Sequence, residues 1–114
     1  MENKNKPYSH NAKPMFYAIL LEKLIKIANE CGYALAVHGS LKSDLDLIAV
    51  RWRDDFTGPE TLVERFKELL SKHVFGDYED KNLFKVEERY NNQIHYAIPI
   101  IGDWFIDLTV IKGE

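Results

Sequence analysis

The chain has 114 residues, of which 46% are hydrophobic and 29% are charged, and its formal net charge is −3. This length and composition fit one globular domain and exclude a largely disordered chain. The apolar stretches are too short to cross a bilayer, which excludes a membrane-spanning helix. The slight acidity also argues against a general attraction to polyanions.

The cysteine content and the first residues of the chain bear on the cellular compartment of the protein. Cys31 is the single cysteine and has no partner for an internal disulfide or a zinc cluster. The polar residues 1–6 are followed by no apolar segment of the kind found in secretory signals. The sequence therefore predicts a cytoplasmic protein without a membrane anchor.

The N-terminal third is predicted to be a tail followed by a helix. Residues 1–13 are rich in Asn, Lys, Ser and Pro, which predicts a flexible N-terminal tail before a single domain over residues 14–114. The helix is expected to begin at Pro14 and to end at Gly32, since apolar residues between them recur at helical spacing. Its core-facing residues are expected to be Phe16, Ile19, Leu20, Leu24, Ile27, Ala28 and Cys31.

The rest of the chain alternates short apolar runs with one further helix. Residues 33–37 and 45–52 are short apolar runs, which predict two neighbouring strands. A second helix is predicted to follow Thr57 and Gly58. Strands are predicted over 84–89 and 93–100, on either side of a turn at Asn91–Asn92, and the strand-forming stretch 100–111 turns at Gly102–Asp103. This order predicts an α+β domain, a mixed β-sheet with its helices packed on one face.

Two aspartates at the start of the second predicted strand are the main chemical feature. Alternate side chains on a strand share a face, so Asp44 and Asp46 project together while Leu45 points into the core. Their backbones lie roughly 7 Å apart. Two such carboxylates repel unless a cation lies between them, and oxygen ligands suit Mg²⁺ or Mn²⁺. The pair therefore predicts a metal site.

A third carboxylate is expected from Asp107, which interrupts the apolar run over residues 104–111. A charge inside such a strand is costly when it is unpaired. The alternatives are that Asp107 joins the metal site or acts as a base, or that it pairs with a lysine or caps a turn.

Residues before Asp44 are candidates for binding phosphate. Gly39 allows the backbone to approach an anion closely, and Ser40 offers its hydroxyl and its amide. Lys42 lies beside this site and could neutralise a phosphate, although a solvated loop lysine is equally compatible with its position. His38 could contact phosphate or ribose, or simply satisfy a hydrogen bond at the strand end.

His95 is a further candidate because of its strand position. If Ile94, Tyr96 and Ile98 take the core side of their strand, His95 and Gln93 share the opposite side. Strand alternation alone does not identify that side as the site.

The glycine-serine turn, the Asp44-Leu45-Asp46 run and the later "FIDLTVI" segment resemble the DNA polymerase β-like nucleotidyltransferase superfamily. In closer detail, "VHGSLKSDLDLIAV" is similar to small nucleotidyltransferase-like proteins of phages and prophages. The likeness covers residues 34–50 and 104–111. The loop between Ser40 and Asp44 is shorter than in most members of the superfamily.

The resemblance implies a metal-dependent enzyme that transfers a nucleoside monophosphate from an NTP to a hydroxyl acceptor on a small molecule, an RNA end or a protein. Asp44 and Asp46 would bind the two metal ions, and Asp107 would join one of them and help to deprotonate the acceptor. Gly39 and Ser40 would hold the triphosphate. The alternatives are an inactive nucleotide-binding or regulatory module of the same fold, which the short loop favours, and an antitoxin-like modifier of a partner protein. A homo-oligomer is also compatible with these readings.

Overall fold

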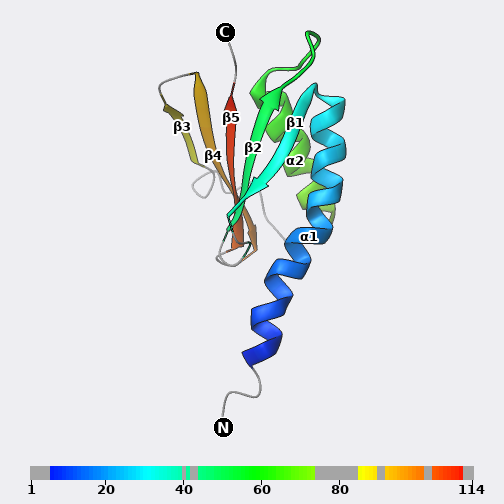
Figure 1. Cartoon of the computed structure of the whole chain (residues 1–114), viewed down its shortest axis with the longest axis vertical. Coiled ribbons are helices and arrows are strands. Elements are labelled where there is room, and N and C mark those ends of the chain that lie inside the picture. Colours follow the sequence, from blue (N-terminus) through cyan, green and yellow to red (C-terminus); the bar gives the residue numbers. More distant parts are fainter. Residues whose placement is uncertain are drawn as a thin grey trace.

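A computed structural model of the chain describes residues 6–39, 41, 44–73, 85–89, 92–101 and 104–111. Within them, helices and strands follow one another as predicted from the sequence, and the domain is α+β (Figure 1). The elements are α1 (Lys6–Glu30), β1 (Tyr33–His38), β2 (Leu45–Arg51), α2 (Pro59–His73), β3 (Lys85–Arg89), β4 (Gln93–Ile101) and β5 (Trp104–Ile111).

The strands form one mixed sheet in the order β1-β2-β5-β4-β3. The pair β2 and β5 is parallel, and the other neighbouring pairs are antiparallel. Because β5 returns beside β2, Asp107 lies directly opposite Asp46, although the two are far apart in the sequence. The connection through α2, β3 and β4 therefore brings the two predicted site strands together.

One face of the sheet carries the core. The buried residues of β2 are Leu45, Leu47 and Ala49, and buried residues of β4 and β5 continue the same rows across the sheet. Both helices lie on this side of the sheet in Figure 1, with α1 contributing Leu24 and α2 contributing Phe66 to the core. Among the described residues, no helix covers the opposite face. The prediction of helices packed on one face is confirmed.

The start of α1 differs from the sequence prediction. The helix begins at Lys6, so Pro14 lies inside it and the part of the predicted tail from residue 6 to residue 13 is helical. The prediction was wrong because proline favours the first helical turn and the residues before it have few apolar side chains to reveal a helical period. Among the described residues, neither helix is long and apolar enough to span a membrane.

The core-facing side of α1 is also corrected at one position. Ile19 was expected in the core but is 66% exposed, whereas Tyr17 is fully buried. The buried line runs through Tyr17, Leu24 and Ala28, and at roughly 100° per residue Ile19 falls on nearly the opposite side of the helix. Apolar character alone therefore misassigned one residue of the helix.

The turn from α1 into β1 packs against the connection from β2 to α2. Gly32 ends the helix with a φ of +94°, and a Cβ there would lie 2.6 Å from the Cα of Phe56, so only glycine fits. The hydroxyl of the fully buried Tyr33 donates a hydrogen bond to the carbonyl oxygen of Thr57 at 2.7 Å. Burial, the largest effect, raises the pKa of Tyr33 from 10.0 to about 12.

We expect Tyr33 to make the stability of the domain fall at alkaline pH. Because the pKa is higher in the folded state than in the unfolded state, the contribution is complete below pH 10.0 and is lost as the pH rises through about 12. The loss amounts to about 3 kcal/mol of the free energy of unfolding. Urea unfolding between about pH 9 and pH 12 should show a steeper decline for the wild type than for Tyr33→Phe. Equal slopes would contradict this role.

Candidate metal centre

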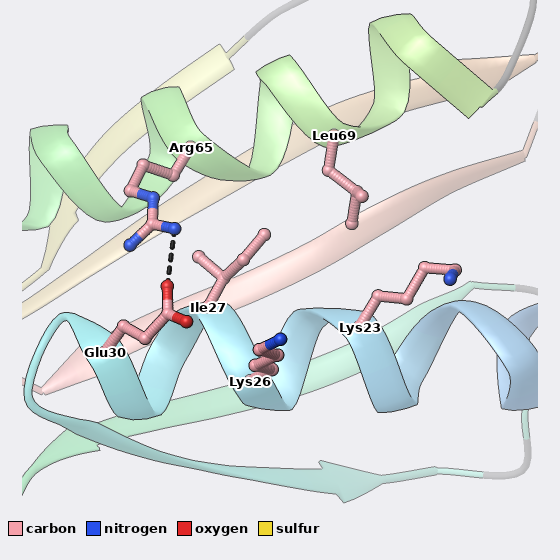
Figure 2. Close-up of a pocket in the computed structure, with 6 residues that line it drawn as sticks. All are labelled: Lys23, Lys26, Ile27, Glu30, Arg65 and Leu69. Atoms are coloured by element: carbon pink, nitrogen blue, oxygen red, sulfur yellow. Dashed lines mark hydrogen bonds and ion pairs between the residues drawn. The ribbon is translucent and has the colours of Figure 1, made fainter.

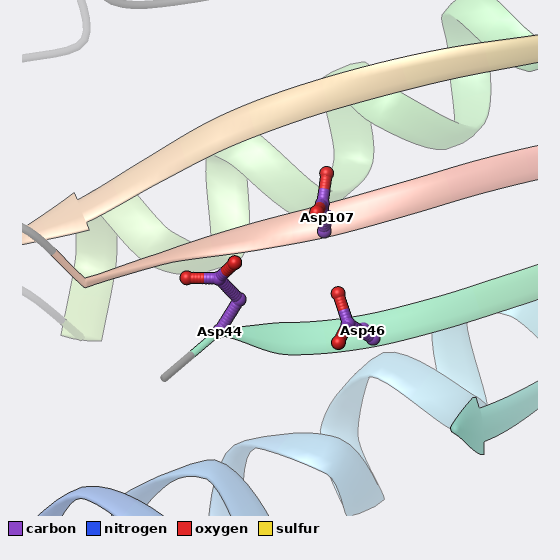
Figure 3. A group of neighbouring side chains, drawn as sticks. All are labelled: Asp44, Asp46 and Asp107. Atoms are coloured by element: carbon purple, nitrogen blue, oxygen red, sulfur yellow. The ribbon is translucent and has the colours of Figure 1, made fainter. Parts of the chain in front are cut away.

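The structure brings the three predicted aspartates together on the face of the sheet opposite the two helices. Asp44 precedes the first residue of β2, Asp46 is the second residue of β2, and Asp107 lies in β5 (Figure 3). One carboxylate oxygen from each lies within 4.8 Å of the others, and all three residues are partly buried. This spacing suits a shared cation, because each carboxylate can supply an oxygen to one ion.

Strand pairing explains why these residues meet. Asp46 is paired with His38 of β1 on one side and with Asp107 of β5 on the other. Leu45 and Leu47, its neighbours along β2, are fully buried on the core face, which fixes the direction of the Asp46 side chain. A shift of one residue in register would bury the carboxylate and expose the leucines.

The carboxylates perturb one another. Partial burial, the largest effect, raises the pKa of Asp46, and the negative charges of Asp107 and Asp44 raise it further. A hydrogen bond with Asp107 acts in the same direction, whereas His38 lowers the pKa. All but one of these influences disfavour the charged form of Asp46, so the cluster is electrostatically strained without a cation.

Gly39 has a steric role beside Asp46. Its φ is +91°, and an added Cβ would lie 2.7 Å from Oδ2 of Asp46. Glycine therefore leaves the space next to this carboxylate open, which fits the prediction that the backbone allows close approach here. Leu41 also has a positive φ, of 64°, so the turn between β1 and β2 holds a conformation that costs a non-glycine residue energy.

Of the other predicted phosphate ligands, the structure describes one. His38 is exposed at the end of β1, beside Asp46 in the sheet. Ser40 and Lys42 lie outside the described residues.

His95, which the sequence offered only as a further candidate because of its strand position, contacts the cluster. Its Nε2 contacts Oδ1 of Asp107, across the neighbouring strands β4 and β5. Ile94, Tyr96 and Ile98 are buried, so the alternation considered from the sequence did indicate which side of β4 His95 occupies. The missing information was the pairing of β4 with β5, which the sequence does not specify.

A pocket lies away from the aspartates, between the two helices. It has a volume of about 320 Å³ and is bordered by Lys23, Lys26, Ile27, Glu30, Arg65 and Leu69 (Figure 2). Across it, Arg65 of α2 forms an ion pair with Glu30 of α1 at 2.6 Å. None of the predicted site residues borders this pocket, because the helices cover the core face of the sheet and the aspartates occupy the other.

The donor atoms fit a hard divalent cation. All three candidate ligands are carboxylates, which Mg²⁺ and Mn²⁺ prefer over nitrogen and sulfur ligands. The three come from the loop before β2, from β2 itself and from β5, so they approach an ion from different directions while water or phosphate oxygens could complete its coordination.

Comparisons of this chain with protein-family models, with curated proteins and with solved structures found no match.

Proposed function

We propose that the protein is a metal-dependent nucleotidyltransferase that transfers a nucleoside monophosphate from an NTP to a hydroxyl acceptor. The observation that carries the proposal is the convergence of Asp44, Asp46 and Asp107 within 4.8 Å on the sheet face opposite the two helices. The likeness of the sequence around Gly39, and around Asp107, to the nucleotidyltransferase superfamily supports the choice of this reaction over other uses of a metal.

In the proposed reaction the acceptor oxygen bonds to the α-phosphorus of the NTP, and the bond from that phosphorus to the bridging oxygen breaks. Pyrophosphate leaves with the electron pair of the broken bond, and the proton of the acceptor hydroxyl passes to Asp107 or to water. Bound Mg²⁺ or Mn²⁺ supplies stabilisation of negative charge on the attacking and leaving oxygens.

The residues of the chain have separate tasks in this scheme. Asp46 and Asp107 would hold the cation from adjacent strands, and Asp44 would hold it from the loop. Gly39 keeps the space beside Asp46 clear for the triphosphate. Ser40 and Lys42 remain predicted phosphate ligands outside the described residues.

The proposal is tested on the wild-type protein by calorimetry with a nonhydrolysable NTP and by release of labelled pyrophosphate from NTP. We expect NTP to bind in the presence of Mg²⁺ or Mn²⁺ and not in the presence of EDTA. Failure to bind at millimolar ligand with either metal would overturn the proposal. Metal-dependent binding without turnover on small-molecule, RNA and protein acceptors would favour the non-catalytic nucleotide-binding module instead.

A further inference from the structure

His95 and Asp107 form a pair at the edge of the metal centre. Nε2 of His95 meets Oδ1 of Asp107, and the two side chains are 19% and 28% exposed. The pair is therefore largely shielded from water, where a hydrogen bond to a carboxylate is stronger than at an open surface. His95 is a direct neighbour of one proposed metal ligand.

The sheet register explains the direction of this contact. Asp107 pairs with Asp46 on the β2 side and with Ala97 on the β4 side, while His95 pairs with Thr109, two residues further along β5. Ala97 has a short side chain, so the imidazole can reach Asp107 diagonally across the gap between β4 and β5. Asp107 is thus flanked by Asp46 on one side and by His95 on the other.

The position of His95 suits it to orient the Asp107 carboxylate rather than to bind the metal directly. The group of ligand atoms within 4.8 Å of one another contains Asp44, Asp46 and Asp107 but not His95. A carboxylate has two oxygens, so a hydrogen bond from an imidazole N–H to one of them fixes its rotation while the other faces a cation. Metal-binding carboxylates in proteins are commonly held in this way.

We propose that His95 is a positioning residue that holds the Asp107 carboxylate in the orientation required for metal binding. This inference rests on the proposed function, since it concerns the same centre. His95 donates its Nε2 proton to Oδ1 of Asp107 and contributes no atom to the metal. Its effect is to reduce the entropy that Asp107 loses when a cation binds, because the side chain is already oriented in the metal-free protein.

The test is the dissociation constant of Mn²⁺, measured from the electron paramagnetic resonance signal of the free ion. His95→Leu removes the donor, and we expect the dissociation constant to rise by about 10- to 100-fold. His95→Gln keeps an N–H at a similar distance from the backbone, and we expect it to restore affinity close to that of the wild type. Circular dichroism of the metal-free proteins checks that each variant is folded.

A matched control comes from the same strand. Gln93 occupies the same face of β4 as His95 but is paired with Ile111, away from Asp107. Gln93→Leu should therefore leave the Mn²⁺ affinity unchanged.

The outcomes separate this inference from the proposed function. If folded His95→Leu binds Mn²⁺ with the same dissociation constant as the wild type, the proposed role of His95 is overturned and the proposed function is unaffected. Equal losses in His95→Leu and His95→Gln also overturn it, because a retained donor would then make no difference. A wild-type protein that binds no Mn²⁺ overturns both.

Discussion

Replacing Asp46 with Asn is expected to lower the rate of the proposed nucleotidyl transfer by about a thousand-fold or more, because several kcal/mol of transition-state stabilisation depend on the metal. An amide nearly matches the shape of the carboxylate but lacks its charge. Asp46 is the central member of the cluster, with Asp107 opposite it and Asp44 two residues before it. We expect Mn²⁺ affinity and pyrophosphate release to fall together.

The same substitution should leave the metal-free protein at least as stable as the wild type. The carboxylate oxygens lie within 4.8 Å of one another, and two like charges at that limit repel by about 3 kcal/mol at an effective dielectric constant of about 20, and by less where water reaches them. Asp46→Asn removes two of these repulsions. Thermal unfolding in EDTA should therefore occur at the same or a higher temperature, whereas the increase caused by Mn²⁺ in the wild type should disappear.

Asp54 provides the control for this experiment. It is an exposed aspartate that follows β2 and lies outside the cluster, so Asp54→Asn makes the same chemical change without altering the site. The control should retain Mn²⁺ binding and turnover. Full activity of Asp46→Asn, or an equal loss in both variants, would show that the cluster is not the centre of the reaction.

The sequence predicted the strands and the shared face of Asp44 and Asp46 because both depend on the local alternation of apolar and polar residues. Leu45 and Leu47 alternate with Asp46, and this pattern fixes which side chains share a face whatever the partner strand. Asp107 was identified by the cost of a charge in an apolar strand. Its position opposite Asp46 came only from the structure, through the parallel pairing of β2 with β5.

Features that depend on contacts between distant segments were not predictable in the same way. The contact of His95 with Asp107 requires the register of β4 against β5, which no local pattern specifies. From the sequence, the role of Gly39 was predicted to be close approach of the backbone to a phosphate. In the structure, the group that a side chain at this position would meet first is the Asp46 carboxylate. The early start of α1 was missed because a helix that projects beyond the sheet needs no apolar stripe at that end (Figure 1).

Replacing Leu47 with Ala is expected to lower the free energy of unfolding by about 2–5 kcal/mol, the largest stability effect among the changes considered. Leu47 is fully buried and is paired with Val37 of β1 and Leu108 of β5, so its loss leaves a cavity beneath the strands that carry the aspartates. Urea unfolding followed by circular dichroism measures the change. Val50→Ala, on the exposed face of β2, should cost less than about 1 kcal/mol.

Addition of Mn²⁺ to Leu47→Ala distinguishes loss of stability from damage to the site. A ligand that binds only the folded state adds about 2.7 kcal/mol at a concentration 100 times its dissociation constant, whatever the stability of the protein. If the backbone of β2 holds Asp46 in place without Leu47, the increment should be the same in the variant and the wild type. A smaller increment would mean that core packing against Leu47 sets the geometry of the metal ligands, and that stability and metal affinity in this fold are coupled through one strand.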